Sequence, residues 1–411
     1  MIDSIEQKSA SHGISLKSQN VRTFTFVLIV IQSIGIRFFS GQGTFLAIVI
    51  ILLSWKGFSF LKKKDITTLA LIIMFLCINS IVNPTFELSS LLFQISLVIS
   101  TYIFLLQYQS VQLLEDDFYR CLKFIFYHAS VGYVLYVLIA QIFSQVDFAG
   151  LSYYNLFYVF YVSAKDYGSL ARNVGLCWEP GVLQLVLNLF LFLSIKRKKS
   201  IFFLCLIGLG ILSTFSTAGY IIVVLNIVYF IILQIRNKAS APIIILVSLI
   251  CLSGFFALIK GNASDKFDSS NTSGLVRLRD FYIGVELITE KPLLGHGIFD
   301  AKYLESKVSV SGIESGLFTR GYLNENGDFS GGYTDGLLGL ACWYGLPAAI
   351  YIYILTFRNK FAGVWYERII LFLILALTCI SEPITYTSIF LLFSFTCFIF
   401  KETKTLKKEP A

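Results

Sequence analysis

The chain has 411 residues with a mean hydropathy of +0.75, and 56% of them are hydrophobic whereas only 14% are charged. This composition is too apolar for soluble domains of the same total length, so the sequence predicts a membrane protein and excludes a large soluble catalytic domain. The formal charge of +8 would ordinarily indicate nucleic acid or an acidic partner. In a membrane protein, however, the positions of lysine and arginine relative to the spans are more informative than their sum.

The apolar runs predict an all-α polytopic integral membrane protein with about 12 transmembrane helices, because crossing a bilayer takes about 20 apolar residues. Residues 1–411 form a single transmembrane domain, with predicted spans at 23–40, 43–60, 66–83, 88–107, 124–143, 180–195, 201–216, 219–235, 242–259, 336–356, 369–381 and 387–400. Basic residues occur in every second connection, and the short connections between them lack lysine and arginine. The positive-inside rule therefore places both termini in the cytoplasm.

Two long segments are expected on the outer side, at 144–179 and 260–335. The first is rich in tyrosine and phenylalanine, from Tyr153 to Tyr161. It is typical of an interfacial aromatic belt or a re-entrant stretch, and a platform on which sugar rings stack is the alternative.

The second outer segment carries most of the polar residues. Within it, apolar residues recur at helical spacing and predict an amphipathic helix at about 275–290, lying on the outer membrane surface. Arg277 is at the edge of the apolar stripe, where its guanidinium can turn toward an anion, whereas Arg279 projects elsewhere.

Charged residues gather at the outer ends of the predicted spans, where ionisable groups are costly unless a partner or a water-filled cavity receives them. These are Arg172 before Trp178-Glu179-Pro180, the pair Arg277 and Arg279, Asp335 next to Tyr333, and Glu382 before Pro383. Taken singly, each Glu-Pro pair is explained by a carboxylate next to a helix N-terminus, and each arginine by headgroup pairing. Together they favour a reaction on a lipid-linked diphosphate, in which guanidinium groups hold the pyrophosphate and a carboxylate removes a proton.

Neither a metal nor another cofactor is expected. The three histidines, His12, His128 and His296, are dispersed, and no pair of the eight cysteines predicts a disulfide or a metal site.

Four patches follow one another in a recognisable order: Arg172 to Pro180, the small-residue stretch Ser213 to Gly219, Arg277 with Phe281 and Pro292-Leu293-Leu294-Gly295-His296-Gly297, and Thr334-Asp335-Gly336. In this order they resemble the bacterial O-antigen polymerase (Wzy) and O-antigen ligase (WaaL) superfamily. These are membrane glycosyltransferases that act on undecaprenyl-diphosphate glycans. The arginine that the family often has in the second patch is absent.

The resemblance implies a GT-C-like fold in the bacterial inner (cytoplasmic) membrane, with the active site facing the periplasm. Carried over by position, Arg172 and Arg277 would bind the donor diphosphate, and Arg279 is a third candidate for the same role. The carboxylate base is expected among Glu179, Asp335 and Glu382, and Trp178 and Tyr333 are candidates for contacting the glycan.

Thr334 stands where the ligases have their proposed catalytic histidine, and this favours a polysaccharide polymerase that joins lipid-linked repeat units of O-antigen, capsule or exopolysaccharide. Three alternatives stay open: a ligase acting on lipid A core, for which His296 is the outer histidine; a flippase or other transporter; and a structural scaffold. The expected partners are undecaprenyl-diphosphate-linked oligosaccharides and the lipid bilayer. A chain-length regulator protein is a further candidate partner, and nucleic acid is not expected.

Overall fold

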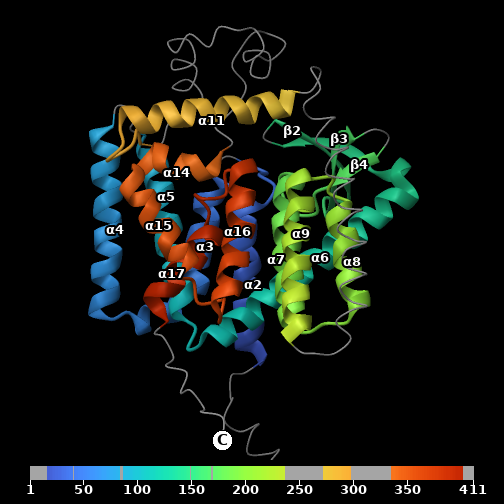
Figure 1. Cartoon of the computed structure of the whole chain (residues 1–411), viewed down its shortest axis with the longest axis horizontal. Helices are drawn as coiled ribbons and strands as arrows, with labels where there is room; N and C mark the ends of the chain where they lie inside the picture. The colour runs from blue at the N-terminus through green and yellow to red at the C-terminus, as the bar shows by residue number, and fades with distance from the viewer. Residues whose placement is uncertain are drawn as a thin grey trace, which may run out of the picture.

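The computed structural model describes residues 16–39, 41–83, 87–148, 150–167, 170–236, 272–297 and 335–400. Upright helices form a bundle, and helix α11 (Thr272–Glu290) lies across one side of it, next to a small β-sheet (Figure 1). We call this side the capped face. Helix α2 (Leu16–Ile34) begins, and α17 (Ser388–Ile399) ends, at the opposite side.

The described chain is mostly helical, as the apolar runs predict. Helices long and apolar enough to cross a membrane cover Lys63–Val82, Leu88–Leu106, Val111–Ile142 and Thr217–Gln234. The remaining elements of the bundle are shorter or less apolar, and the predicted span 242–259 lies outside the described residues. The bundle comprises, besides α2 and α17, α3 (Gln42–Leu53), η1 (Trp55–Phe60), α4 (Lys63–Val82), α5 (Leu88–Leu106), α6 (Val111–Ile139), η2 (Ala140–Ile142), α7 (Pro180–Lys196), α8 (Ile201–Leu212), α9 (Thr217–Arg236), α14 (Gly336–Tyr344), α15 (Leu346–Phe357) and α16 (Trp365–Ser381).

Helix α7 is the centre of one half of the bundle. Every residue from Pro180 to Ile195 is buried, and the helix packs against α6, α8, α9 and α16. Because lipid tails are as apolar as leucine, packing and interhelical hydrogen bonds hold such helices together. The amide of Asn188 donates to Gln184 Oε1 at 3.0 Å, and that of Asn226 on α9 donates to Asn188 Oδ1 at 3.0 Å. Buried amides therefore fix α7 against α9.

The prediction of an all-α protein is wrong in the first long segment. Four strands form an antiparallel meander in the order β1 (Ser144–Phe148), β2 (Leu151–Leu156), β3 (Phe160–Tyr167) and β4 (Leu170–Asn173). Its aromatic and β-branched residues favour a pleated, half-buried surface. Tyr153 and Tyr161 pack with Ile36 and Val174 into a separate apolar cluster. Tyr153 and Tyr161 thus belong to the core of a small sheet next to the end of α2, whereas Phe157 and Tyr158 at the turn between β2 and β3 are exposed.

The predicted span 336–356 is also wrong as a single helix, because α14 and α15 are separated at Gly345. This glycine has φ 85°, and Pro347 follows it in the first turn of α15. The turn after α11 fills the break: Leu346 N donates to Pro292 O at 2.7 Å, and His296 N donates to Cys342 O at 2.7 Å. The turn that ends α11 therefore caps α14 and redirects the chain into α15.

Replacing Gly345 by alanine tests this junction. An alanine here would have to adopt a positive φ, and its Cβ would overlap the backbone of Leu293. We therefore expect the free energy of unfolding to fall by about 1–3 kcal/mol. Gly208→Ala in α8 is the matched control, since a Cβ at Gly208 meets no atom within 4 Å. Thermal unfolding of both variants in detergent measures the difference, and equal melting temperatures would contradict the junction.

Candidate functional site

The capped face holds the beginning of α7 and the end of α16 in direct contact. Glu179 precedes the first helical residue, Pro180, whose missing N–H suits that position. Glu382 follows α16 and is buried, with 5% of its surface exposed. A side chain at Gly181 would overlap the Glu382 carboxylate, so the carboxylate lies against the backbone of the first turn of α7. The helix N-terminus there favours a negative charge.

Arg172, on β4, is anchored to the turn between α8 and α9. Its Nε donates to Thr214 O at 3.1 Å and its Nη2 donates to Phe215 O at 3.5 Å. The next residue, Asn173, donates its backbone N–H to Ser213 O at 2.9 Å. Two of the patches noted in the sequence, Arg172 to Pro180 and Ser213 to Gly219, therefore meet through backbone carbonyls.

The electrostatics of Arg172 identify its charged neighbours. Burial lowers the pKa of its guanidinium, the charges of Glu179 and Glu382 raise that pKa, and the charge of Arg277 lowers it. An arginine stays protonated in a protein under these conditions. The structure therefore brings a second predicted diphosphate-binding arginine, Arg277, and two of the three predicted carboxylates within electrostatic range of Arg172.

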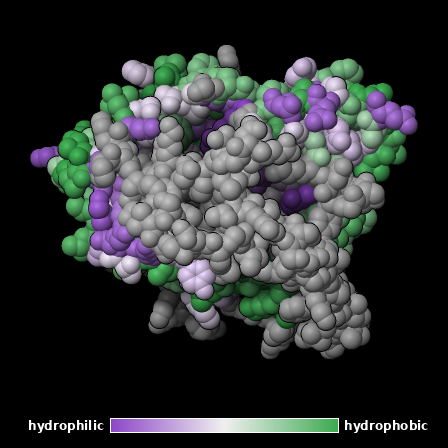
Figure 2. Space-filling view, turned by 90° about the horizontal axis from the view of Figure 1, so that it is seen from above, coloured by the Kyte–Doolittle hydropathy of each residue, from purple (hydrophilic) through white to green (hydrophobic). Residues whose placement is uncertain are grey.

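Arg277 belongs to α11, which crosses the capped face above the bundle (Figure 1). Figure 2 views the molecule from this side, where hydrophilic residues lie beside hydrophobic ones on the described surface. The side chain of Arg279 and all of Tyr333 lie outside the described residues, so the roles predicted for these two stay predictions.

Asp335 has a different environment. It caps α14 by accepting the N–H of Leu338 at 3.0 Å. Burial raises the pKa of its carboxyl, the backbone N–H groups of Leu338 and Leu337 lower that pKa, and the charge of Asp280 on α11 raises it. The turn after α16 is close by, since Gly336 packs against the backbone of Glu382. Asp335 thus caps α14, and the like charge of Asp280 raises its pKa. Glu179 and Glu382, in contrast, raise the pKa of Arg172 by their opposite charge.

Trp178 links the site to α2 and the sheet. The backbone N–H of Trp178 donates to Ile34 O at 3.1 Å, and Tyr153 OH donates to the backbone carbonyl of Trp178 at 2.8 Å. Arg37 lies over the indole, 6.0 Å from the ring centroid, in the range of a cation–π contact. Arg37 was not predicted as a site residue, although an arginine at the outer end of an apolar run was a usable signal.

The arrangement combines fixed positive donors with carboxylates beside a helix N-terminus. It is suited to bind an anionic group next to a group that accepts a proton. Within the described parts of the chain, no three histidine, cysteine, aspartate or glutamate side chains are grouped as metal ligands.

Comparison with known proteins gives one match. A family model for O-antigen ligase matches residues 201–322, which include the turn between α8 and α9 that holds Arg172, and Arg277 on α11. The match confirms the predicted resemblance to the polymerase and ligase superfamily. No curated protein and no solved structure matches the chain.

The contact between Gly181 and Glu382 is testable by a double-mutant cycle. Gly181→Ala forces the buried carboxylate away from the first turn of α7, so we expect it to destabilise the wild-type chain by about 1–3 kcal/mol. The same substitution in a Glu382→Ala chain should cost much less, because the overlapping atoms are gone. Thermal unfolding of the four chains gives the coupling, and additive effects would show that the two residues are not in contact.

Proposed function

We propose that this chain, whose residues 201–322 match the O-antigen ligase family model, is a polysaccharide repeat-unit polymerase. It transfers a glycan from undecaprenyl diphosphate to the nonreducing sugar of a second lipid-linked repeat unit at the periplasmic face of the inner membrane. The bond between the anomeric carbon and the diphosphate oxygen breaks, and a glycosidic bond to the acceptor oxygen forms. The acceptor hydroxyl loses its proton to a carboxylate, and undecaprenyl diphosphate leaves. The observation that carries this proposal is the half-buried Arg172, which is anchored to Thr214 O and Phe215 O and acted on by the charges of Glu179, Glu382 and Arg277.

Arg172 is well placed to bind the leaving group. Its hydrogen bonds to Thr214 O and Phe215 O orient the guanidinium and use two of its five N–H donors, which leaves others for a phosphate oxygen. Negative charge grows on the diphosphate as the glycosidic bond breaks. Donors fixed in advance in a partly dehydrated site stabilise this charge without reorganisation in the transition state.

Glu382 is our first candidate for the general base. Its carboxylate is held on Gly181 by close packing, whereas Glu179 is half-buried and makes no side-chain cap to α7. The Glu179 charge also reaches the sheet, because with burial it raises the pKa of Tyr153. Glu179 is therefore better placed to orient the acceptor sugar near Trp178, and Glu382 to accept the proton.

The environment of His296 supports polymerase over ligase. A ligase of this superfamily would need an outer histidine as its base. His128 packs on the sheet, with its Nε2 2.9 Å from Val159 O and its ring stacked on Phe160. The second described histidine is His296. Its side chain is 1% exposed, and its Nε2 makes a hydrogen bond of 2.9 Å with Leu287 O. It therefore serves the junction between α11 and α14. The description of the matching family as O-antigen ligase keeps transfer to lipid A core as the second candidate.

The arginine assignment is tested by Arg172→Ala and Arg277→Ala, made singly in cells that carry the cognate repeat unit. Loss of one transition-state donor costs about 10²–10³ in rate, so both variants should give short chains or single repeats on a polysaccharide gel. Arg358→Ala is the control, because Arg358 is exposed at the end of α15. Full-length polymer from either test variant at normal membrane levels would refute the assignment.

The base is tested by Glu382→Gln, Glu179→Gln and Asp335→Asn. Loss of a general base costs about 10²–10⁴ in rate, so Glu382→Gln should have the lowest turnover. Asp335→Asn should stay active, because asparagine also caps a helix. Initial rates of polymer formation in membranes measure this order. Three variants with wild-type rates would remove the carboxylate proposal.

Deletion of the gene separates the candidate functions in one experiment. A polymerase predicts that single, unpolymerised repeat units reach the cell surface. Free undecaprenyl-linked polymer that is not ligated would mean a ligase, and repeat units retained on the cytoplasmic leaflet would mean a flippase. The lipid-linked intermediates are identified by mass spectrometry of the extracted membrane.

A further inference from the structure

The turn between β2 and β3 exposes three consecutive apolar side chains. Phe157 is 81% exposed, Tyr158 is 67% exposed and Val159 is 48% exposed. The sheet lies at one edge of the capped face (Figure 1), and we call this turn, residues 157–159, the hairpin tip. Contiguous exposed apolar side chains mark a surface that contacts a partner or a membrane.

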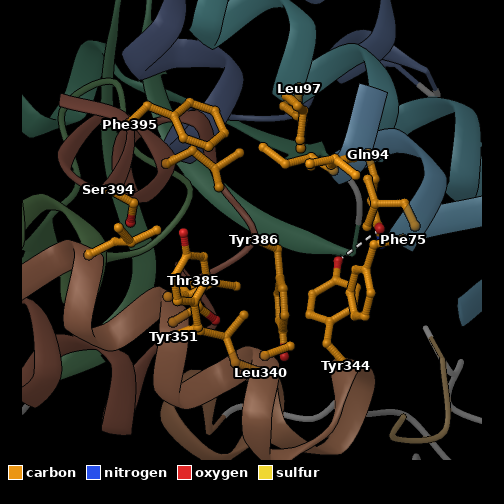
Figure 3. A pocket seen from close by; sticks show the side chains of 18 of the residues that line it. Phe75, Gln94, Leu97, Leu340, Tyr344, Tyr351, Thr385, Tyr386, Ser394 and Phe395 are labelled. Carbon is orange, nitrogen blue, oxygen red and sulfur yellow. Dashed lines mark hydrogen bonds between the residues drawn. The ribbon is translucent and has the colours of Figure 1, made fainter. Parts of the chain in front are cut away.

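Aromatic side chains inside the bundle have a different environment. Tyr344 and Phe395 are buried although both line a cavity of about 600 Å³ between α4, α5, α14, α15 and α17, and Tyr344 OH donates to Gln94 Oε1 at 2.8 Å (Figure 3). Phe157 and Tyr158 have no such cover. They belong instead with the exposed rings on the outside of the bundle.

The backbone of the hairpin tip has a conformation that its residues disfavour. Phe157 has φ 55° and Tyr158 has φ 56°, and Val159 N donates to Leu156 O at 3.1 Å, as in a two-residue hairpin turn of type I′. Such turns prefer Asn-Gly, because bulky residues are strained at positive φ. Strain of this kind is concentrated at functional sites. Two aromatic residues here therefore indicate a role for their rings.

The polar backbone groups of the hairpin tip are paired within the protein. Asn155 Oδ1 accepts the N–H of Tyr158 at 3.2 Å, and Tyr161 OH donates to Tyr158 O at 2.8 Å. From α6, His128 Nε2 makes a hydrogen bond of 2.9 Å with Val159 O. A turn in contact with lipid needs such internal partners, because hydrocarbon offers none.

The hairpin tip lies at the level where α8 ends on the capped face. Asn173 Nδ2 donates to Ala129 O on α6 at 3.3 Å and to Oγ of Ser213, which follows α8, at 3.0 Å. His128 precedes Ala129 and bonds to the hairpin tip, so the tip, this part of α6 and the end of α8 share one level. In a membrane this level is the edge of the hydrocarbon core, where aromatic residues are favoured.

The hairpin tip also continues the apolar face of α6. The ring of His128 stacks on Phe160, with centroids 5.0 Å apart, and lies 6.3 Å from the ring of Phe124, one turn earlier on α6. Phe124, Val131 and Val134 are exposed. Because α6 is among the helices long and apolar enough to cross a membrane, its exposed apolar face contacts lipid. The hairpin tip adjoins that face.

We propose that the hairpin tip inserts into the bilayer at the capped face, between the lipid headgroups and the upper part of the acyl chains. A glycan is the other candidate partner for two exposed rings. A site for such a polar ligand combines apolar contact with well-placed polar groups, however, and the hydrogen bonds of Tyr158 and Val159 use those of the turn. These observations therefore favour lipid.

Insertion gives the sheet a fixed position relative to the membrane. Strand β3, which leaves the hairpin tip, pairs its Ser163 with Arg172 on β4. The anchored tip therefore holds Arg172 at a constant height above the bilayer. This consequence rests on the proposed function, in which Arg172 meets a lipid-linked diphosphate at that height, whereas the lipid contact itself does not.

Lipid contact is tested with the photo-crosslinker p-benzoylphenylalanine in place of Phe157, in the full chain reconstituted in vesicles of phosphatidylethanolamine and phosphatidylglycerol. Asp147 on β1 is the control position, because it is exposed and pairs with Ser152 toward the other end of the sheet. By mass spectrometry we expect phospholipid adducts from position 157 and none from position 147. Equal lipid labelling at both positions, no lipid adduct at position 157, or adducts there with added polysaccharide from the same cells would overturn the proposal.

Phe157→Asn combined with Tyr158→Gly separates the anchoring of the sheet from the folding of the turn. This pair suits a type I′ turn, so the variant should melt in detergent at the wild-type temperature or above it. Without the rings, we expect it to lose most of the initial rate of polymer formation in membranes. Phe157→Trp combined with Tyr158→Trp should keep that rate, since tryptophan also favours the membrane interface.

A wild-type rate from the variant that lacks both rings would refute the positioning of Arg172 by the hairpin tip. Failure of the proposed function is distinguishable from failure of this inference. A wild-type chain that forms no polymer from its cognate repeat unit would refute the former, and the lipid adducts at position 157 would still decide the latter.

Discussion

The carboxylate of Glu382 lies against Gly181 in the first turn of the most completely buried helix of the bundle, and the charged site depends on this contact. A carboxylate at the edge of a membrane is costly unless other groups compensate it. Here the N-terminus of α7 and the guanidinium of Arg172 provide that compensation. Because only glycine leaves room for the carboxylate, this backbone position lets Glu382, at the end of α16, lie against the first turn of α7.

The β-sheet gives Arg172 a rigid support. A site carried by regular elements is held more precisely than one carried by loops. Strand β4 carries Arg172, and its neighbour Asn173 is bonded to the turn between α8 and α9. That turn lies within the segment that matches the O-antigen ligase family. The sheet and the turn thus meet at one guanidinium, although Arg172 and Thr214 are 42 residues apart in the sequence.

The sequence predicted most helices because hydropathy is a local property that a short window reveals. The charged ends of the spans also pointed to Arg172 and to Glu179, Glu382 and Arg277, which the structure brings within electrostatic range of Arg172. The sheet was missed, because strand pairing is not local and an aromatic segment has the same composition as an interfacial belt. The break at Gly345 was missed for a similar reason, since the turn at Pro292 that fills it is distant in the chain. Asp335 was grouped with the glutamates, but the like charge of Asp280 that acts on it was not foreseeable from spacing.

We propose that the charged site between α7 and α16 transfers a glycan from a polyisoprenyl diphosphate. The most direct measurement uses the purified full chain in nanodiscs with a synthetic repeat unit linked to undecaprenyl diphosphate, and follows the products by mass spectrometry. We predict lipid-linked species of two or more repeats together with released undecaprenyl diphosphate in equal amount to the bonds formed, and neither product with Arg172→Ala. Release of undecaprenyl diphosphate at the wild-type rate by Arg172→Ala, or no transfer at all by the wild-type chain supplied with its cognate repeat unit, would contradict the account.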